Sequence, residues 1–544
     1  MVKLLDDYQN NPEKFARVGI QTPKYDQHKM IEATKVNPKW VHFGGGNLFR
    51  CFHSTIAQQL LNSGEMRTGV IVAETYDNEV IDEVYHPYKN RFLSVEMMSN
   101  GDLKQELIAS VADSMYVGPD NPEGRQRLKK VFENPSLQLV TFSITEKGYA
   151  LKDINGNLTK GTTHDLNSDP AQAVTNMGFV TWLLLSRYQA NQSPIAMVST
   201  DNFSQNGQKL QDAVMLIAND WKKNGLVDHG FIDYLSNTNK VSFPWSMIDR
   251  ITPNPSTSVS DKLKAEGFED TKIIHTAKHT NIAPFGNTEE THYLVIEDNF
   301  PNGRPALEKA GVMMTDRQTV NDADQMKVTA CLNPLHTSLA IFGCLLGFTS
   351  IADEAHDSDL LKLIKNLGYG EDLPVVIDPK IINPKDFIDT LINKRLPNKN
   401  IPDTPQRIAS DTSQKVGIRY GVTLQHYVDD PKRDPAQLEF IPLVIAAWCR
   451  YLMAIDDQGN TFTPSPDPLY DQLHSYVTNI KIGQDNLKVH EYLKPILSNK
   501  SIFGNDLYQI GLGTKIENYF KKMIQGPGAV RDTLQGTNLK HGHF

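Results

Sequence analysis

The sequence contains few cysteines and no excess of basic residues. Its 544 residues include only 4 cysteines, which are widely spaced and form no CxxC pair. In a chain of this length they indicate neither a disulfide framework nor a zinc site, so we predict buried thiols and no bound metal. The 55 basic residues are outnumbered by 64 acidic ones, giving a net charge of −9. This balance argues against a general nucleic-acid-binding protein, which would normally carry a basic face.

The sequence also lacks an apolar run long enough to span a bilayer. The two most apolar segments, 337–352 and 443–455, fall below the ~20 residues that a spanning helix needs. We therefore expect buried core helices and no membrane partner. The first residues, Met1 to Asp7, are charged and have no signal-peptide core, so we expect a cytoplasmic protein. The sequence leaves open whether it is a monomer or a homodimer.

No repeat or low-complexity tract is present, and the first ~300 residues alternate short apolar strands with amphipathic helices. This pattern is typical of a parallel sheet with crossover helices. The predicted strands include 40–43, 69–73, 137–143 and 194–199. Polar segments at 145–149 and 200–202 follow the last two, at the strand ends where open α/β sheets bind ligands.

The second half of the chain has a mostly helical pattern of apolar residues. Long helical patterns dominate it, from about 325 to 347 and from 435 to 455, and strand-like segments become rare. We predict an α/β protein with two domains. An N-terminal Rossmann-like domain, 1–303, is followed by a mostly α-helical domain, 304–544.

A glycine-rich turn lies between a predicted strand and a predicted helix. Gly44 to Gly46 would let a pyrophosphate approach the helix N-terminus. An acid after the second strand, Glu74 or Asp77, could bind ribose hydroxyls and would repel a 2′-phosphate, which favours NAD over NADP. The dinucleotide fingerprint is incomplete, because Phe49 replaces its third glycine. A tight structural turn is the alternative.

A lysine, an amide and an imidazole begin the longest helical pattern of the second half. They are Lys327, Asn333 and His336, beside an otherwise apolar run. A structural interpretation is available for all three: Asn333 caps a helix before Pro334, Lys327 is solvated and His336 is a hydrogen-bonded core histidine. A catalytic cluster is the alternative.

Two cations, Arg407 and Lys415, lie eight residues apart in a segment rich in hydrogen-bonding groups. On a continuous helix this spacing places both on roughly one face, where they could grip an oxyanion or a polyhydroxyl chain. A solvated helix face is equally compatible with the spacing.

Taken together, these segments resemble the mannitol dehydrogenase family, the long-chain polyol-specific dehydrogenases, over nearly the whole chain. The resemblance implies a Rossmann-like domain, a helical domain, and a metal-independent, NAD(P)-linked reaction in the cleft between them. The segments that carry it are the Gly-x-Gly-x-x-x-Arg turn of Gly44, Gly46 and Arg50, Thr145–Tyr149, Asp201-Asn202 with Asn206-Gly207, Phe243–Pro253, Val295–Pro305, Leu332–His336 and Asp411–Lys415.

The resemblance also implies roles for individual residues. Lys327 would be the general base, and Asn202 and Asn333 would stabilise the oxyanion. His336 would orient the reacting hydroxyl. The implied substrate-binding residues are Asp249, Arg407 and Lys415, and the implied cofactor-binding residues are Phe43, Gly44, Gly46, Asn47, Arg50, Glu74, Asp77, Thr145 and Glu146.

The lysine departs from the family spacing. Lys327 precedes Asn333 by six positions, one more than in the family. One extra residue rotates a side chain by about 100° on a regular helix, and a π-bulge could absorb it. Lys327 is the only lysine in the dozen residues before Asn333, so we assign it as the base, with Lys415 as the next candidate.

The resemblance implies the type of reaction more specifically than it implies the substrate. The Trp40–Gly46 turn and the Asn-Pro-Leu-His sequence at 333–336 look most like the fructuronate reductase (mannonate oxidoreductase) branch of the family. Its reaction is D-mannonate + NAD⁺ ⇌ D-fructuronate + NADH. A sugar acid would use Arg407 and Lys415 as carboxylate partners. Mannitol or another neutral polyol, and altronate (tagaturonate), stay open, as does an NAD-binding sensor or epimerase without net dehydrogenase activity.

Overall fold

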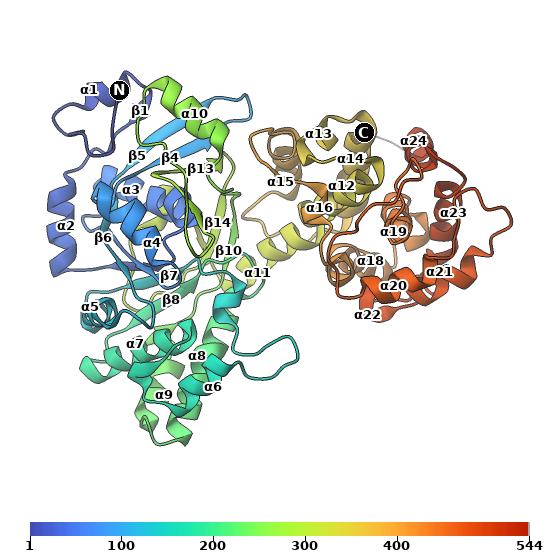
Figure 1. The fold of residues 1–544 in the computed structure, drawn as a ribbon. Coiled ribbons are helices and arrows are strands. Elements are labelled where there is room, and N and C mark those ends of the chain that lie inside the picture. The colour runs from blue at the N-terminus through green and yellow to red at the C-terminus, as the bar shows by residue number, and fades with distance from the viewer. Residues whose placement is uncertain (542–544) are drawn as a thin grey trace. The chain divides into compact units, whose positions relative to one another are not determined.

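The computed structural model describes residues 1–541 and divides the chain into two compact units (Figure 1). Unit 1 is Met1–Asn321, and unit 2 begins at Asp322, within helix α11 (Arg317–Met326). The sequence places this division at residue 303. The segment 304–321 belongs to unit 1, because its strand β15 (Met313–Thr315) pairs in parallel with β14 (Tyr293–Glu297).

The centre of unit 1 is a six-stranded sheet with the order β6-β3-β2-β7-β8-β9, in which every pair of neighbours is parallel. The chain starts in the middle and winds outward in both directions, which is the doubly wound Rossmann arrangement with its switch point between β2 and β7. The predicted Rossmann-like sheet is confirmed. The strands are β2 (Trp40–Phe43), β3 (Val70–Glu74), β6 (Val111–Tyr116), β7 (Leu139–Phe142), β8 (Ile195–Ser199) and β9 (Val241–Ser242).

Both faces of this sheet are buried, which explains its continuous apolar strands. Successive side chains point to opposite faces, so Val41 and Phe43 enter one core and Trp40 enters the other. The first core also receives helices α5 (Pro122–Glu133), α7 (Asn176–Ala190), α8 (Asn206–Lys223) and α9 (His229–Ser236), which Figure 1 shows together on one side of the sheet. The second core receives α3 (Ser54–Asn62) and β14.

Three smaller sheets complete unit 1, and none of them was predicted from the sequence. A mixed sheet has the order β1-β5-β4-β13, a second has the order β10-β14-β15, and a third pairs β11 with β12. Their strands are β1 (Ile20–Gln21), β4 (Phe92–Met97), β5 (Leu103–Ile108), β10 (Ser246–Asp249), β11 (Ile274–His275), β12 (Asn281–Ile282) and β13 (Phe285–Glu289). The remaining α-helices are α1 (Pro12–Ala16), α2 (Gln27–Val36), α4 (Asn78–Val80), α6 (Lys160–Asn167) and α10 (Thr257–Glu266).

Unit 2 is helical, as predicted. Its α-helices are α12 (Asn333–Leu346), α13 (Ile351–His356), α14 (Ser358–Lys365), α15 (Pro384–Thr390), α16 (Pro405–Ile408), α17 (Thr412–Val416), α18 (Val422–Asp429), α19 (Phe440–Tyr451), α20 (Tyr470–Val477), α21 (Val489–Leu497), α22 (Lys500–Phe503), α23 (Gly513–Met523) and α24 (Ala529–His541). Helices α12 and α19 form its centre, and α19 is buried at every position.

The apolar helices and the cysteines have the predicted environments. Within the described residues, one helical stretch, Arg317–Leu346, is long and apolar enough to cross a membrane by length and composition, and 78% of its most apolar window is buried inside the protein. That burial is what a core helix shows. The four cysteines are free and buried, as expected.

Candidate functional site

The glycine turn follows β2 at the switch point of the central sheet. Gly44 has a φ of +106°, and a Cβ there would clash with the carbonyl oxygen of Ser143, so only glycine fits. A Cβ on Gly46 would meet no atom within 4 Å, which leaves space beside the turn. Asn47, where the helix begins, has a buried Oδ1 that has no hydrogen-bond partner among residues 1–541. Open space, a helix N-terminus and an unpaired amide oxygen together fit the pyrophosphate and ribose of a dinucleotide.

Of the two candidate acids, Glu74 is the one that contacts the turn. Its Oε2 accepts a hydrogen bond from the N–H of Gly45 at 2.8 Å. Its Oε1 accepts hydrogen bonds from the N–H groups of Tyr76 and Asp77 at 2.9 and 3.2 Å. Burial raises the pKa of Glu74, and these three donors oppose the shift. Asp77 instead caps α4 and accepts the Thr276 hydroxyl at 2.6 Å.

Phe43 and Arg50 contribute to packing around the turn. Phe43 stacks on Phe142 with ring centroids 5.0 Å apart. The Arg50 side chain is fully buried, donates from Nη2 to the Ala283 carbonyl at 2.5 Å, and lies over the Phe92 ring at 5.0 Å. Burial lowers the pKa of Arg50. These contacts show both side chains in the interior beneath the turn.

The carboxyl ends of β7 and β8 bring further predicted residues to the same edge of the sheet. Thr145 has a positive φ of +64°, and its N–H donates to Asp201 Oδ1 at 2.9 Å. Glu146 is exposed, and so is Asn202, which directly follows Asp201. Asp249 is the last residue of β10 and is 7% exposed. The polar segments 145–149 and 200–202 therefore lie just after β7 and β8, as predicted from the sequence.

In unit 2, Lys327 begins a π-helical turn. Helix α11 ends at Met326, and Lys327–Cys331 form the π turn, after which α12 begins at Asn333. A π turn accommodates one residue more than an α turn, so the bulge that the spacing suggested is present, and its placing Lys327 at the family's lysine position stays a prediction. Lys327 is only 3% exposed, and its Nζ lies 3.8 Å from Oδ1 of Asp324. The interpretation of Lys327 as a solvated lysine is therefore wrong.

The structural interpretation of Asn333 as a helix cap is also wrong. Leu332 occupies the N-cap of α12, so Asn333 is its first residue and not its cap. His336 Nε2 lies 3.2 Å from Asp403 Oδ2, so the partly exposed imidazole faces a carboxylate. This contact fits a core histidine with a partner and fits a histidine that Asp403 positions for substrate.

Arg407 and Lys415 do not share one helix, contrary to the sequence prediction. They belong to two short helices, α16 and α17, because Asp411 between them adopts a φ of +55° and donates its N–H to Pro466. The cations are nevertheless close enough to interact: burial, Arg419 and Arg407 lower the pKa of Lys415, and Asp411 and Asp467 raise it. Three cations thus share one region of unit 2.

The structure adds residues that the sequence analysis does not assign. Asp324 lies beside Lys327, and Asp403 links His336 to Arg407, whose Nε donates to Oδ1 of Asp403 at 2.8 Å. Asp324 precedes Lys327 by three residues, and Asp403 precedes Arg407 by four. Side chains at these spacings are neighbours on a helix, so both pairs could have been predicted from the sequence. The partly buried Arg419 donates to the Thr337 hydroxyl on α12, a contact between distant segments that no local pattern indicates.

Glu354 on α13 is the most unusual of these additional residues. It is fully buried, and neither carboxyl oxygen has a hydrogen-bond partner within the described residues. It packs against Gly343 of α12, where a Cβ would overlap its carboxyl group. Burial, followed by repulsion from Asp403, raises the pKa of Glu354 to about 9, so the group is a neutral acid near the His336–Asp403 pair.

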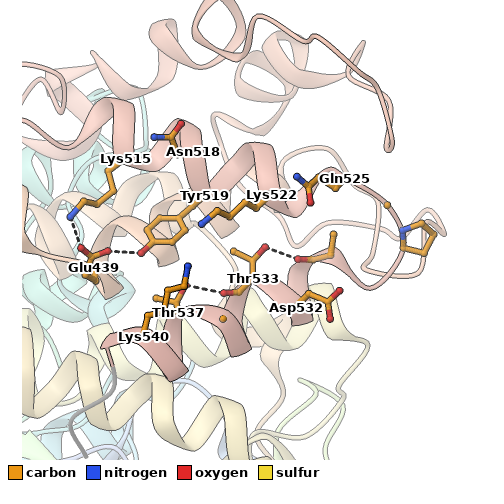
Figure 2. Close-up of a pocket in the computed structure, with 14 residues that line it drawn as sticks. Glu439, Lys515, Asn518, Tyr519, Lys522, Gln525, Asp532, Thr533, Thr537 and Lys540 are labelled. Atoms are coloured by element: carbon orange, nitrogen blue, oxygen red, sulfur yellow. Dashed lines mark hydrogen bonds and ion pairs between the residues drawn. The ribbon is translucent and has the colours of Figure 1, made fainter.

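A separate hollow of about 570 Å³ lies among the start of α19, α23 and α24 (Figure 2). At one side of it, Glu439 accepts Lys515 Nζ at 2.8 Å and the Tyr519 hydroxyl at 2.6 Å. None of the predicted site residues lines this hollow. Its size alone therefore does not identify it as the reaction site.

Comparison with known families shows which family the chain belongs to. The model of the mannitol dehydrogenase Rossmann domain matches residues 38–309, and the model of the mannitol dehydrogenase C-terminal domain matches residues 320–524. The chain belongs to the mannitol dehydrogenase family. It is accordingly an oxidoreductase of the class that acts on CH–OH groups, with the fold that the resemblance implies.

Individual members of the family are similar over nearly the full chain. A D-mannonate oxidoreductase of Thermotoga maritima is 51% identical over 95% of this chain and 96% of its own. The structure of Pseudomonas fluorescens mannitol 2-dehydrogenase in a ternary complex with NAD and D-mannitol superposes with a TM-score of 0.70 at 25% identity, covering 99% of this chain and 100% of that one. A substrate-free D-sorbitol dehydrogenase shares the fold with a TM-score of 0.77 at 24% identity, over 95% and 97% of the two chains.

Proposed function

We propose that the protein interconverts D-mannonate and D-fructuronate with NAD: D-mannonate + NAD⁺ ⇌ D-fructuronate + NADH + H⁺. The observation that carries this proposal is the 51% identity, over 95% of the chain, to a protein named D-mannonate oxidoreductase. The relatives named as mannitol 2-dehydrogenases are 25–28% identical. Sequence similarity therefore favours the sugar acid over the neutral polyol.

The preference for NAD is supported by the acid beside the glycine turn. The mannitol 2-dehydrogenase relative was solved with NAD, and the open space beyond Gly46 fits a dinucleotide. The Glu74 carboxyl group is fixed on Gly45 and would repel the 2′-phosphate of NADP. Gly44, Gly46 and Asn47 would hold the pyrophosphate side. Thr145 and Glu146 would border the cofactor at the end of β7.

The cations of unit 2 support an anionic substrate. Arg419 and, less strongly, Arg407 lower the pKa of Lys415, while Asp411 and Asp467 raise it. A substrate carboxylate would form charge-assisted hydrogen bonds with Arg407 and Lys415. A neutral polyol would offer these cations only uncharged acceptors. We assign Asp249 to the sugar hydroxyls, since a carboxylate accepts hydrogen bonds from them.

The reaction itself requires a proton acceptor and donors for the developing alkoxide. The bound nicotinamide supplies the hydride acceptor. Lys327, which is buried beside Asp324, takes the hydroxyl proton. Asn202 and Asn333 donate amide N–H groups to the alkoxide oxygen, each contributing roughly 3–4 kcal/mol by analogy with measured oxyanion donors. His336 would orient the hydroxyl, and Asp403, whose Oδ2 lies 3.2 Å from His336 Nε2, would hold the imidazole.

The experiment is a panel of D-mannonate, D-altronate, D-mannitol and D-arabinitol, each with NAD⁺ and with NADP⁺, read as formation of reduced nicotinamide. We expect the highest kcat/KM for mannonate with NAD⁺. Faster oxidation of altronate or mannitol would replace the proposed substrate. No reduction with any pair, together with tight NADH binding, would favour a sensor or epimerase, and product analysis by NMR would separate those two.

We also propose the cytoplasm as the compartment, because four free, buried thiols suit a reducing environment. Cell fractionation followed by activity measurement tests this, and activity in a membrane or extracellular fraction would contradict it.

A further inference from the structure

The loop after β7 contains a residue in a conformation that its side chain disfavours. Thr145 has a φ of +64° and a ψ of +161°, in a region that is otherwise nearly restricted to glycine. A β-branched residue at positive φ is a genuine outlier. Such strain persists only where the surrounding structure enforces it, and it is concentrated at functional sites.

The group that enforces this conformation is the carboxylate of Asp201. Its Oδ1 accepts the Thr145 N–H at 2.9 Å, and its Oδ2 accepts the Ile144 N–H at 3.0 Å and the Tyr149 hydroxyl at 2.6 Å. The Tyr149 oxygen also lies 2.8 Å from Ser199 Oγ. Two consecutive backbone N–H groups and one phenol thus point at a single carboxylate that is 6% exposed. Burial raises the pKa of Asp201, and the three donors oppose that shift.

Asp201 is itself held firmly at the carboxyl end of β8. Its carbonyl oxygen accepts from Asn206 Nδ2 at 3.0 Å, and the same amide lies 2.9 Å from Ser246 Oγ. Asn206 is the first residue of α8. The carboxylate is therefore fixed by a strand and a helix, and it can impose its geometry on the loop that it binds.

The strained loop lies at the switch point of the sheet. Ser143, two residues before Thr145, is the residue whose carbonyl excludes any side chain from Gly44. Within the described residues the Thr145 hydroxyl makes no hydrogen bond, and the side chain is exposed. On the other side of Asp201 follows Asn202, a proposed oxyanion donor. The Asp201 carboxylate is thus hydrogen-bonded to the loop beside the proposed cofactor site, and the exposed Asn202 follows it directly in sequence.

We propose that Asp201 is a positioning residue that holds the Ile144–Glu146 loop in its strained form, so that this loop borders the bound dinucleotide. The inference rests on the proposed function, because it assigns the loop to the NAD site of that reaction. Asp201 touches neither cofactor nor substrate in this account. Its effect reaches the dinucleotide through Thr145.

The test is a double-mutant cycle of Asp201→Asn and Thr145→Gly, read by direct NADH binding to the full-length protein and by steady-state kinetics. Asparagine is nearly isosteric but can no longer accept from both loop N–H groups. We expect Asp201→Asn to weaken NADH binding about tenfold, and the same change in the Thr145→Gly background to weaken it less than about threefold, because glycine adopts positive φ without strain. Equal losses in both backgrounds would overturn the proposal.

Asp165 on α6 provides a matched control. Its carboxylate is 1% exposed and accepts the N–H groups of Val174 and Thr175 at 2.7 and 2.9 Å, which is the same kind of clamp in the same unit. Asp165→Asn should lower the melting temperature without changing NADH affinity. If it weakens NADH binding as much as Asp201→Asn, the effect is general destabilisation and the inference fails.

Two further measurements distinguish a failure of this inference from a failure of the proposed function. The NADH dissociation constant does not depend on which sugar is oxidised, so failure of mannonate turnover would remove the proposed function and leave this test intact. Thr145→Gly alone should raise the melting temperature, because it relieves the strain. A lower melting temperature would contradict the strained conformation itself.

Discussion

Nε2 of His336 lies 3.2 Å from Oδ2 of Asp403, and the other oxygen of the same carboxylate accepts Nε of Arg407 at 2.8 Å. Asp403 is 7% exposed, and Ile351 on α13 donates its N–H to the Asp403 carbonyl at 3.0 Å. A fixed carboxylate therefore lies between the proposed hydroxyl-orienting histidine and a proposed substrate cation.

Asp403→Asn should disturb both neighbours at once. It keeps the shape of the side chain but removes the charge that attracts Arg407 and holds the imidazole. We expect kcat for mannonate to fall about tenfold and KM to rise several-fold, since comparable supporting contacts at active sites contribute 10–100-fold. The control is Asp378→Asn, whose exposed carboxylate pairs only locally with Lys380. Kinetics for Asp403→Asn within twofold of the unaltered protein would show that the pair has no role.

Lys327→Ala should nearly abolish turnover while leaving cofactor affinity unchanged. The lysine is in unit 2, and the glycine turn is in unit 1. We expect kcat to fall by about 10²–10⁴, the usual contribution of a positioned general base, and NADH affinity to stay within twofold. Turnover near that of the unaltered protein would move the base elsewhere, and Lys415→Ala is the next variant to measure.

The two cations should matter more for a sugar acid than for a neutral sugar. Charge-assisted hydrogen bonds to a carboxylate contribute about 1.5–3 kcal/mol, which corresponds to roughly 10–150-fold in binding. We therefore expect Arg407→Gln and Lys415→Met each to raise KM for mannonate at least tenfold. KM for mannitol, measured with the same variants, should change less than threefold. Equal effects on both sugars would place the substrate carboxylate elsewhere.

Glu354 should make stability depend on pH. Its pKa in the folded protein is about 9, against 4.5 for an unperturbed glutamate, so the folded state holds one more proton between these values. The stability contributed by the neutral acid is therefore fully present below about pH 4.5 and is lost as the pH rises through about 9. Glu354→Gln stays neutral at every pH, so its melting temperature should fall less than that of the unaltered protein between pH 6 and pH 9.5.

The size of the Glu354 effect can be checked against an exposed glutamate. A change of about 1 kcal/mol shifts the melting temperature of a unit of this size by about 2–4 °C, so the two proteins should diverge by at least that amount at high pH. Glu491→Gln, at a side chain that is 65% exposed, should follow the unaltered protein. Parallel melting curves for Glu354→Gln and the unaltered protein would contradict the raised pKa.

The central sheet could be predicted because its strands are buried on both faces. Each strand is a short continuous apolar run, and polar clusters such as Thr145–Tyr149 follow where the strands end. The antiparallel pair β4 and β5 was missed, although Asn100-Gly101 between two apolar runs is a hairpin signal. The switch at Lys327 from α to π turn could be proposed only from spacing, because no single residue type encodes it.

Most of the site in unit 2 depends on contacts between distant segments. Asp411 breaks the helix that would have joined Arg407 to Lys415, and its conformation is supported by Pro466, more than fifty residues later. Glu354 reaches its unpaired position only because Gly343 of another helix leaves room for it. Periodicity within one segment contains no information about such contacts, so neither residue could be placed from sequence.

The central claim is a metal-independent oxidation of mannonate by NAD⁺ with Lys327 as base. The most direct test is kcat/KM for D-mannonate and for D-mannitol with NAD⁺, measured with and without EDTA. The Lys327→Ala variant is the negative control. We expect NADH formation that EDTA does not reduce, a kcat/KM at least tenfold higher for mannonate than for mannitol, and a kcat/KM for Lys327→Ala that is lower by at least about a hundredfold. A higher kcat/KM for mannitol, inhibition by EDTA, or equal rates with Lys327→Ala would contradict it.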